Sequence, residues 1–317
     1  MTDGYELRDA ALIANNNHRL ERIQWEAAAT AFRARLLSSG NRIKEQTYRE
    51  DYAAYIDYAI ELLSSKKPPR NGGELAEQTA EKWREKPRAL EKCCIAINRF
   101  LEYATEHHGA PAKSWLLSRE RLKEIRGRPA KKKSLAHLEE EEVLRLFEEN
   151  RKGRNGAEWA NYVALVATYG LRREEPWHCE PREHPTKGWQ MYCAYEKISG
   201  NDRTKPRWLR ALPPEGSSAL WGDLVEAMRQ GKLPLPNTNP QAWNNRLARM
   251  SYWQSLNEKY ETKMRLSLKP GALRDTYSFR AHRRGLRLNT ICLAMGHSIT
   301  THQQHYAWAS EETPYDD

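Results

Sequence analysis

The chain has 317 residues, which is long enough for two domains that each bury a hydrophobic core. It carries 52 Lys and Arg against 42 Asp and Glu, and this net charge of +10 favours an anionic partner such as nucleic acid, although a basic protein without such a partner stays open. No apolar run reaches the roughly 18 residues of a membrane-spanning helix, and the amino terminus lacks the basic-then-apolar layout of a secretory signal, so we expect a cytoplasmic protein with no membrane partner.

The first half of the chain is patterned as helices. Apolar residues recur at helical spacing in three stretches, 18–37, 48–63 and 87–106. The sequence KKPPRNGG at 66–73 predicts a loop between the second and the third. These patterns predict an N-terminal helical extension over 1–42 and a helical domain over 43–126.

The segment 127–133, GRPAKKK, is expected to link two domains. It has no apolar anchor, it contains Gly and Pro, and it concentrates positive charge. A basic tether of this kind can also run along a phosphate backbone, where contacts set position and not sequence choice.

The second half, 134–317, is predicted to be a mainly helical domain with a small antiparallel sheet. Helical patterns begin at 134–149 and continue in the apolar run 162–169. Short strands are expected at 189–195 and 208–212, on either side of the polar turn 199–205. The remainder is helical again.

Four short polar segments, called islands below, stand out in this second half. Arg172 follows a buried helix and a glycine in the sequence YGLRREE, and Lys205 ends the polar turn. Arg274 lies in LRDTY, and His297 and Tyr306 lie in MGHSITTHQQHY. Singly, each has an ordinary structural explanation such as a salt bridge or an exposed turn.

In this order and spacing, the islands resemble the motifs of the tyrosine recombinase, or phage integrase, family. The family's GLR-x-x-E is similar to Gly170–Glu175, and its R-x-[ST]-[FY] with a glycine eleven residues on is similar to the stretch from Arg274 to Gly285. Its LGH with a tyrosine nine residues after the histidine is similar to Met295–His297 with Tyr306. The register from Arg274 to Tyr306 needs no gap. The resemblance covers 134–308 well and 43–126 only in layout.

The resemblance implies a two-domain clamp on DNA, with 43–126 as the core-binding domain and 134–317 as the catalytic domain. It implies site-specific recombination or integration through a covalent phosphotyrosyl intermediate. Attack on a phosphodiester builds negative charge that two guanidiniums can hold, and a tyrosine attacks well only beside cations or a base. The implied roles are a phosphate clamp by Arg172 and Arg274, attack by Tyr306, protonation of the leaving DNA hydroxyl by Lys205, a hydrogen bond to the phosphate from His297, and orientation of Arg172 by Glu175.

The resemblance also implies double-stranded DNA as partner, a homo-oligomer that is a tetramer on paired sites, and a prokaryotic, phage or plasmid origin. No cofactor and no metal are expected. The five cysteines are odd in number, and no pair has the spacing of zinc ligands.

One departure from the family pattern concerns acid–base chemistry. The family has H-x-x-R at the second arginine, whereas this chain has Gly271 in place of the histidine, and the histidine that often follows the arginine is Asp275. Either another group or water accepts the proton, or the chain is a DNA-binding relative with weak or no activity. His282, His302 and His305 are weak candidates for compensation, with packed, polar or solvent-facing roles as the ordinary interpretation.

Two site assignments have rivals. Lys205 is preferred to Lys197 because it lies eight residues before Pro213, and Tyr306 is preferred to Tyr315 because the latter lies in an acidic tail. A type IB topoisomerase, which shares the same chemistry, is a further alternative function.

Overall fold

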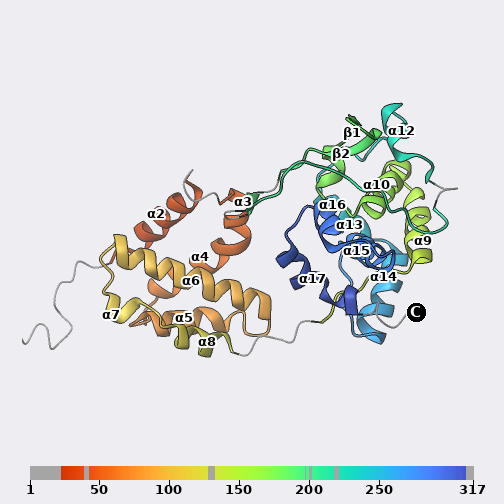
Figure 1. Ribbon diagram of the computed structural model, residues 1–317. Helices are drawn as coiled ribbons and strands as arrows, with labels where there is room; N and C mark the ends of the chain where they lie inside the picture. The colour runs from red at the N-terminus through yellow and green to blue at the C-terminus, as the bar shows by residue number, and fades with distance from the viewer. Residues whose placement is uncertain are drawn as a thin grey trace, which may run out of the picture. The chain divides into compact units, whose positions relative to one another are not determined.

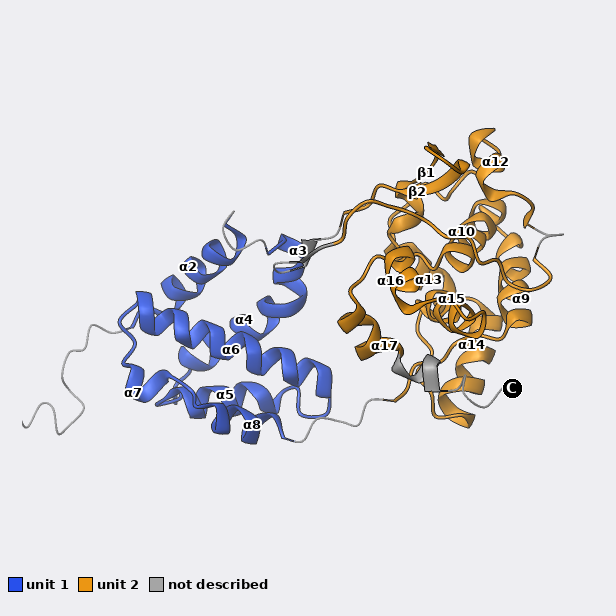
Figure 2. Ribbon diagram, viewed as in Figure 1, with its two compact units in different colours: residues 1–131 blue, residues 132–317 orange. Residues whose placement is uncertain are grey.

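The computed structural model describes residues 23–38, 43–127, 133–196, 198–199, 202–217 and 221–311. The chain divides into two compact units, 1–131 and 132–317 (Figure 2). The division falls in the basic segment 127–133, of which 128–132 lie outside the described residues. Within the described part, the structure is mainly helical with a small antiparallel sheet, which confirms the expected fold class.

Unit 1 is a helical bundle around one long helix, α6. The described elements are α2 (Trp25–Leu37), α3 (Glu45–Tyr48), the π-helical η1 (Arg49–Ala53), α4 (Ala54–Leu63), α5 (Gly72–Glu81), α6 (Pro87–His107), α7 (Ala112–Trp115) and α8 (Arg119–Arg126). Proline suits the first position of α6, where its missing N–H would have had no helical partner. Phe100 and Leu101 of α6 are fully buried, and α2, α4, α5 and α8 all pack against this helix (Figure 1).

The helices of unit 1 follow the apolar spacing of the sequence, with two differences. α2 places Phe32 in the same core as Phe100, so this part of the segment 1–42 packs as an integral part of unit 1. Its expected start at His18 lies outside the described residues. Helix α5 follows the predicted loop and was not expected, because its apolar face is short and rich in alanine.

Unit 2 is built around α10 (Gly156–Tyr169), whose residues 162–169 are all buried. Helices α9 (Glu140–Arg151) and α15 (Ala272–Arg283) pack on it. The other described helices are η2 (Glu175–His178), α12 (Leu224–Arg229), α13 (Gln241–Ala248), α14 (Ser251–Asn257), the π-helical η3 (Glu258–Lys263), α16 (Leu288–Met295) and α17 (Ile299–Glu311).

The sheet of unit 2 has three antiparallel strands in the order β1 (Cys179–His184), β2 (Gly188–Cys193) and β5 (Arg207–Trp208). Cys193 of β2 pairs with Arg207 of β5. The predicted polar turn contains a further small pair, β3 (Ile198–Ser199) with β4 (Asp202–Arg203). Strand β1 was not predicted, because its sequence, CEPREH, lacks the alternation of apolar and polar residues that is typical of a strand.

The start of the predicted helix 134–149 is wrong by six residues. Residues 134–136 are extended and pair with Ser267, through bonds from Ser267 N to Ser134 O at 2.8 Å and from Ala136 N to Ser267 O at 3.0 Å. Helix α9 begins only after Glu139, where Glu139 and Glu142 form a capping box. Acidic side chains that satisfy the first N–H groups therefore set the boundary, and not the apolar pattern.

Candidate active site

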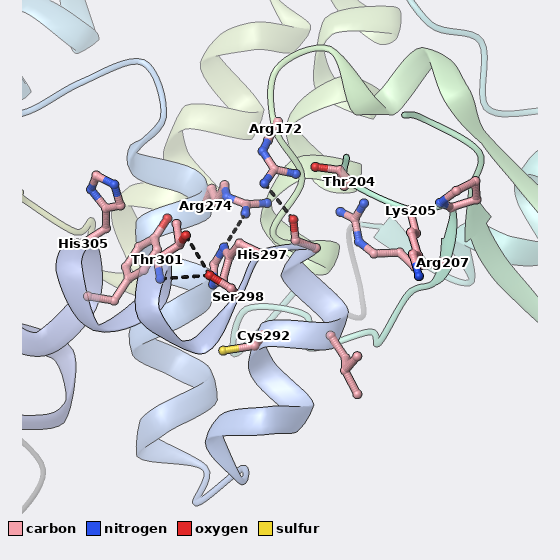
Figure 3. A pocket seen from close by; sticks show the side chains of 14 residues that line it. Arg172, Thr204, Lys205, Arg207, Arg274, Cys292, His297, Ser298, Thr301 and His305 are labelled. Atoms are coloured by element: carbon pink, nitrogen blue, oxygen red, sulfur yellow. Dashed lines mark hydrogen bonds between the residues drawn. The ribbon is translucent and has the colours of Figure 1, made fainter. Parts of the chain in front are cut away.

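A cavity of about 810 Å³ in unit 2 is lined by all five residues that the sequence assigns to catalysis. Figure 3 labels four of them, Arg172, Lys205, Arg274 and His297. The five residues reach the cavity from separate segments: Arg172 follows α10, Lys205 lies between β4 and β5, Arg274 is in the first turn of α15, His297 follows α16, and Tyr306 is in α17. Arg207, Cys292, Thr301 and His305 also line it. Segments up to 134 residues apart in sequence thus build one polar cavity.

A glycine positions Arg172. Gly170 ends α10 in the left-handed region at φ +63°, and a Cβ there would lie 2.4 Å from the ring of Tyr277. Any other residue would be strained and would displace this buried ring. The chain then turns so that Glu175 accepts two bonds of 2.8 Å from Arg172, one from its backbone N–H and one from its guanidinium.

Glu175 is the centre of a cluster of three guanidiniums. Its fully buried carboxylate lies 2.8 Å from Arg172, 2.8 Å from Arg207 and 3.9 Å from Arg274. Burial alone would raise the pKa of Glu175, but Arg207, Arg274 and Arg172 outweigh it and hold that pKa below its ordinary value. Three positive charges against one negative charge leave the cluster at +2. A largely buried excess of positive charge of this kind is suited to an anionic ligand.

Arg207 is the site residue that the sequence did not reveal. Its Nε donates to the carbonyl of Ala294 at 2.8 Å, its Nη2 binds Glu175, and its side chain is 9% exposed. Its Nη1 is buried and has no hydrogen-bond partner among the described residues. Gly296 makes the approach possible, because a Cβ there would lie 2.7 Å from the guanidinium carbon. Arg207 lies outside the sequence motifs that resemble the family, so no local pattern indicated that it belongs to the site.

Arg274 is held by backbone carbonyls at its rear. Its Nη1 donates to the carbonyl of Gly170 at 2.5 Å and its Nη2 donates to that of Met295 at 2.8 Å. Nη2 also lies 3.0 Å from Nδ1 of His297. The side chain is only 10% exposed, so its position is fixed before any ligand arrives.

Three histidines continue from Arg274 in a single chain of hydrogen bonds. Nε2 of His297 lies 2.9 Å from Nδ1 of His302, and Nε2 of His302 lies 2.9 Å from Nε2 of His282. Because Arg274 can only donate, His297 must accept at Nδ1 and donate from Nε2, and the same polarity passes to His302 and then to His282. All three rings are therefore neutral in this arrangement.

The pKa values of the histidines agree with this polarity. Burial, reinforced by Arg274, lowers the pKa of His297 to about 3. Burial, reinforced by His282, lowers the pKa of His302 to about 4. The solvent-facing role considered for His302 is wrong, because this residue is 2% exposed. The N–H of His297 that was expected to meet the phosphate donates to His302 in the free protein, so it must change partner to do so.

Cys292, His297 and His302 place possible metal-ligand atoms within 4.8 Å of one another. The sequence did not associate Cys292 with the histidines. All four ring nitrogens of His297 and His302 already lie within hydrogen-bond distance of Arg274, of each other or of His282, so a metal would have to displace at least one of these partners. The hydrogen bonds of this cluster therefore oppose metal binding.

Tyr306 lines the same cavity from a kink of α17, where its φ is −129° and its ψ is 15°. Its side chain is 7% exposed, its ring stacks on His297 with centroids 5.7 Å apart, and its hydroxyl interacts with Arg274 and Asp275. Burial raises the pKa of Tyr306, and Arg274 opposes that shift only in part. The rival Tyr315 and the rival Lys197 lie outside the described residues, whereas Lys205 is exposed at the cavity.

The position of the missing histidine is empty space. Gly271 is the N-cap of α15 with φ −86°, and a Cβ at this position would meet no atom within 4 Å.

In the described part of the chain, no helix combines the length and apolar character needed to cross a bilayer.

Comparison with known proteins places this geometry in a known fold. No family model matches the sequence, and no curated protein matches it. The Tn1549 transposon integrase in complex with transposon right end DNA is similar in structure, with a TM-score of 0.54 at 12% identity over 90% of this chain and 96% of that one. A lambda integrase tetramer bound to a Holliday junction has a TM-score of 0.52 at 12% identity over 94% of this chain and 83% of that one. The chain therefore has the tyrosine recombinase fold, as its motifs predicted.

Proposed function

We propose that this protein is a tyrosine-type site-specific recombinase that cleaves and rejoins DNA through a phosphotyrosyl intermediate. The observation that carries the proposal is the +2 cluster of Arg172, Arg207 and Arg274 around Glu175, in one cavity with Tyr306. A phosphodiester is an anion that gains charge on its nonbridging oxygens during attack, and prepositioned guanidiniums stabilise that charge most.

The chemistry requires a nucleophile and an acid on opposite sides of the phosphorus. Tyr306 attacks, the new bond joins its oxygen to phosphorus, and the bond to one DNA oxygen breaks. Lys205, exposed at the cavity, protonates that departing oxygen. The covalent link keeps the energy of the phosphodiester, so a DNA hydroxyl can reverse the step without ATP. When DNA binds, the N–H of His297 donates to a phosphate oxygen in place of His302.

The partner in this proposal is duplex DNA, which unit 2 and a core-binding domain at 43–126 both bind. The two solved structures of the same fold contain DNA, and one of them is a tetramer on a Holliday junction. We extend this to a tetramer on paired sites and to the movement of a mobile element, with a cytoplasmic location in a prokaryotic, phage or plasmid setting.

A second candidate is a DNA-binding relative that does not cut. Gly271 favours it, because the imidazole that usually assists the tyrosine is absent and no other side chain fills its space. This candidate shares the phosphate cluster but predicts no covalent product.

Incubation of the full chain with nicked duplexes of random sequence, followed by denaturing electrophoresis, separates the two candidates. The recombinase gives a protein–DNA adduct that survives denaturation, and Tyr306→Phe abolishes it. Tyr252→Phe is the matched control, because Tyr252 lies on α14 and does not line the cavity. An adduct that persists in Tyr306→Phe, or no adduct from the wild type while the DNA is retained in native gels, contradicts the recombinase.

A further inference from the structure

Tyr306 needs a proton acceptor that the family pattern does not supply here. Its hydroxyl is buried, and burial raises its pKa, so very little phenolate exists at neutral pH. The usual histidine is Gly271, and this position offers no side chain. Another group in contact with the hydroxyl, or water, must therefore take the proton.

Two of the histidines beside Tyr306, His297 and His302, are unsuited to this task. His297 uses its acceptor nitrogen for Arg274, and His302 uses its acceptor nitrogen for His297. Both rings lie against Tyr306, with centroids 5.7 and 4.9 Å from its own. They contact the face of the phenol, and no lone pair is left for its hydroxyl proton.

Asp275 is the group that contacts the hydroxyl. It is 8% exposed on α15, one residue after the phosphate-clamping Arg274, and α15 packs against α17, which carries the buried Tyr306. Its carboxyl interacts with the hydroxyl of Tyr306, and an ionised carboxylate can only accept in such a contact, so the hydroxyl donates. Asp275 does not line the cavity, which leaves the cavity side of the Tyr306 oxygen clear for a phosphate.

We propose that Asp275 is the general base that takes the hydroxyl proton of Tyr306 as this oxygen attacks the DNA phosphodiester. The inference rests on the proposed recombinase function and supplies the acceptor that Gly271 lacks. The Tyr306 proton passes to the carboxylate, the oxygen bonds to phosphorus, and the broken bond releases a DNA oxygen that takes a proton from Lys205. Rejoining runs the same transfers backwards, with Asp275 returning its proton to Tyr306, so no oxidant or cofactor is needed.

The surroundings of Asp275 suit a base that works near neutral pH. The charged groups that act on it are Arg274 on its own helix and Lys269 just before that helix, and Tyr306 faces it from α17. Burial outweighs these three influences and raises the pKa of Asp275 to about 6. The carboxylate accepts a proton only when ionised, so cleavage should rise with pH through about 6 and level off above it. His297 and His302, with pKa values of about 3 and about 4, stay neutral across that range.

The test compares Asp275→Asn with the wild type on DNA recovered from the adducts of the random pool. Asparagine keeps the shape but does not accept the proton, and we expect cleavage to fall about 100- to 10,000-fold and to lose its rise through pH 6. Asp223→Asn is the matched control, since Asp223 caps α12 outside the cavity and asparagine also caps helices well. Thermal melting of both variants checks that they fold.

Two further measurements separate a base from a residue that only positions Tyr306. Formate should restore part of the cleavage by Asp275→Ala, because a small carboxylate can occupy the vacated space. DNA with sulfur as the departing atom should rescue Lys205→Ala, since sulfur leaves without a proton, and should not rescue Asp275→Asn.

Near-wild-type cleavage by Asp275→Asn would overturn the inference and leave the recombinase proposal standing. The inference would also be overturned if Asp275→Asn cleaved slowly but kept the rise in cleavage through pH 6. Failure of formate to restore any cleavage by Asp275→Ala would overturn it as well. Absence of any adduct from the wild type is a separate result, because it removes the recombinase proposal itself.

Discussion

The two units of this protein bury different kinds of side chain. Among the described residues of unit 1, no charged side chain is buried, and its core consists of aromatic and aliphatic residues such as Phe100. Unit 2 buries Glu175, Arg274, Asp275 and Arg280. Burying a charge costs stability unless it is paired, so a fold that needed only stability would resemble unit 1.

Burial of charge in unit 2 has two distinct uses. Arg280 pairs with Glu140 at 2.7 and 2.9 Å and donates to the carbonyls of Ala167 and Leu212, and it does not line the cavity. Arg274 is also buried on the same helix, but it lines the cavity in a cluster that has more positive than negative charge. The comparison indicates that a buried charge with its own partner, such as Arg280, stabilises the fold. Buried charges that leave a positive excess, such as those around Arg274, mark the candidate site.

Replacing the two buried arginines should produce opposite failures. Arg274→Ala removes a phosphate donor, and we expect cleavage to fall about 100- to 1000-fold or more. Arg280→Ala leaves Glu140 and two carbonyls without their partner, and we expect a loss of about 3–5 kcal/mol in the free energy of unfolding with near-normal cleavage by the folded fraction. Adduct formation and urea unfolding measure the two effects, and equal loss of cleavage in both variants would erase the distinction.

Truncation in the core of unit 1 should cost stability alone. Phe100 is fully buried and packs against Trp25 and Phe32. Phe100→Ala is expected to lower the free energy of unfolding of unit 1 by about 3–5 kcal/mol. Urea unfolding followed by tryptophan fluorescence reports it. A loss below about 1 kcal/mol would show that this core is not the well-packed apolar one described above.

The smallest effect is expected from restoring the missing histidine. Gly271 has an allowed φ of −86° and open space at its Cβ, so Gly271→His should change the free energy of unfolding by no more than about 0.5 kcal/mol. If Asp275 already accepts the proton, cleavage by Gly271→His alone should change less than about tenfold, whereas Gly271→His should accelerate Asp275→Asn. Large acceleration of the otherwise wild-type protein would show that it lacks a base.

The sequence predicted the site residues that lie in local motifs better than the contacts between distant segments. Arg172, Glu175 and Arg274 lie in motifs whose spacing is local, so their placement followed from the turn at Gly170 and the start of α15. Arg207 approaches through a strand pairing with Cys193, and no local pattern encodes that contact. Asp275 meets Tyr306 only because α15 and α17 pack together.

The fold shows the same division between local and distant determinants. Long helices such as α6 follow directly from apolar periodicity. The start of α9 depends on a pairing between segments 131 to 133 residues apart, from 134–136 to 267, and β1 depends on a strand partner that supplies the contacts its own sequence lacks. Such elements need the tertiary structure before they can be placed.

The most direct test of the account is to locate the DNA attachment by mass spectrometry. The adduct from the random duplex pool is digested with nuclease and protease, and the peptide that retains a nucleotide is sequenced. The account predicts a single nucleotide-linked peptide with the phosphate on Tyr306, in the cavity that Arg172, Arg207 and Arg274 also line. Attachment at Tyr315 or at any other residue would contradict it.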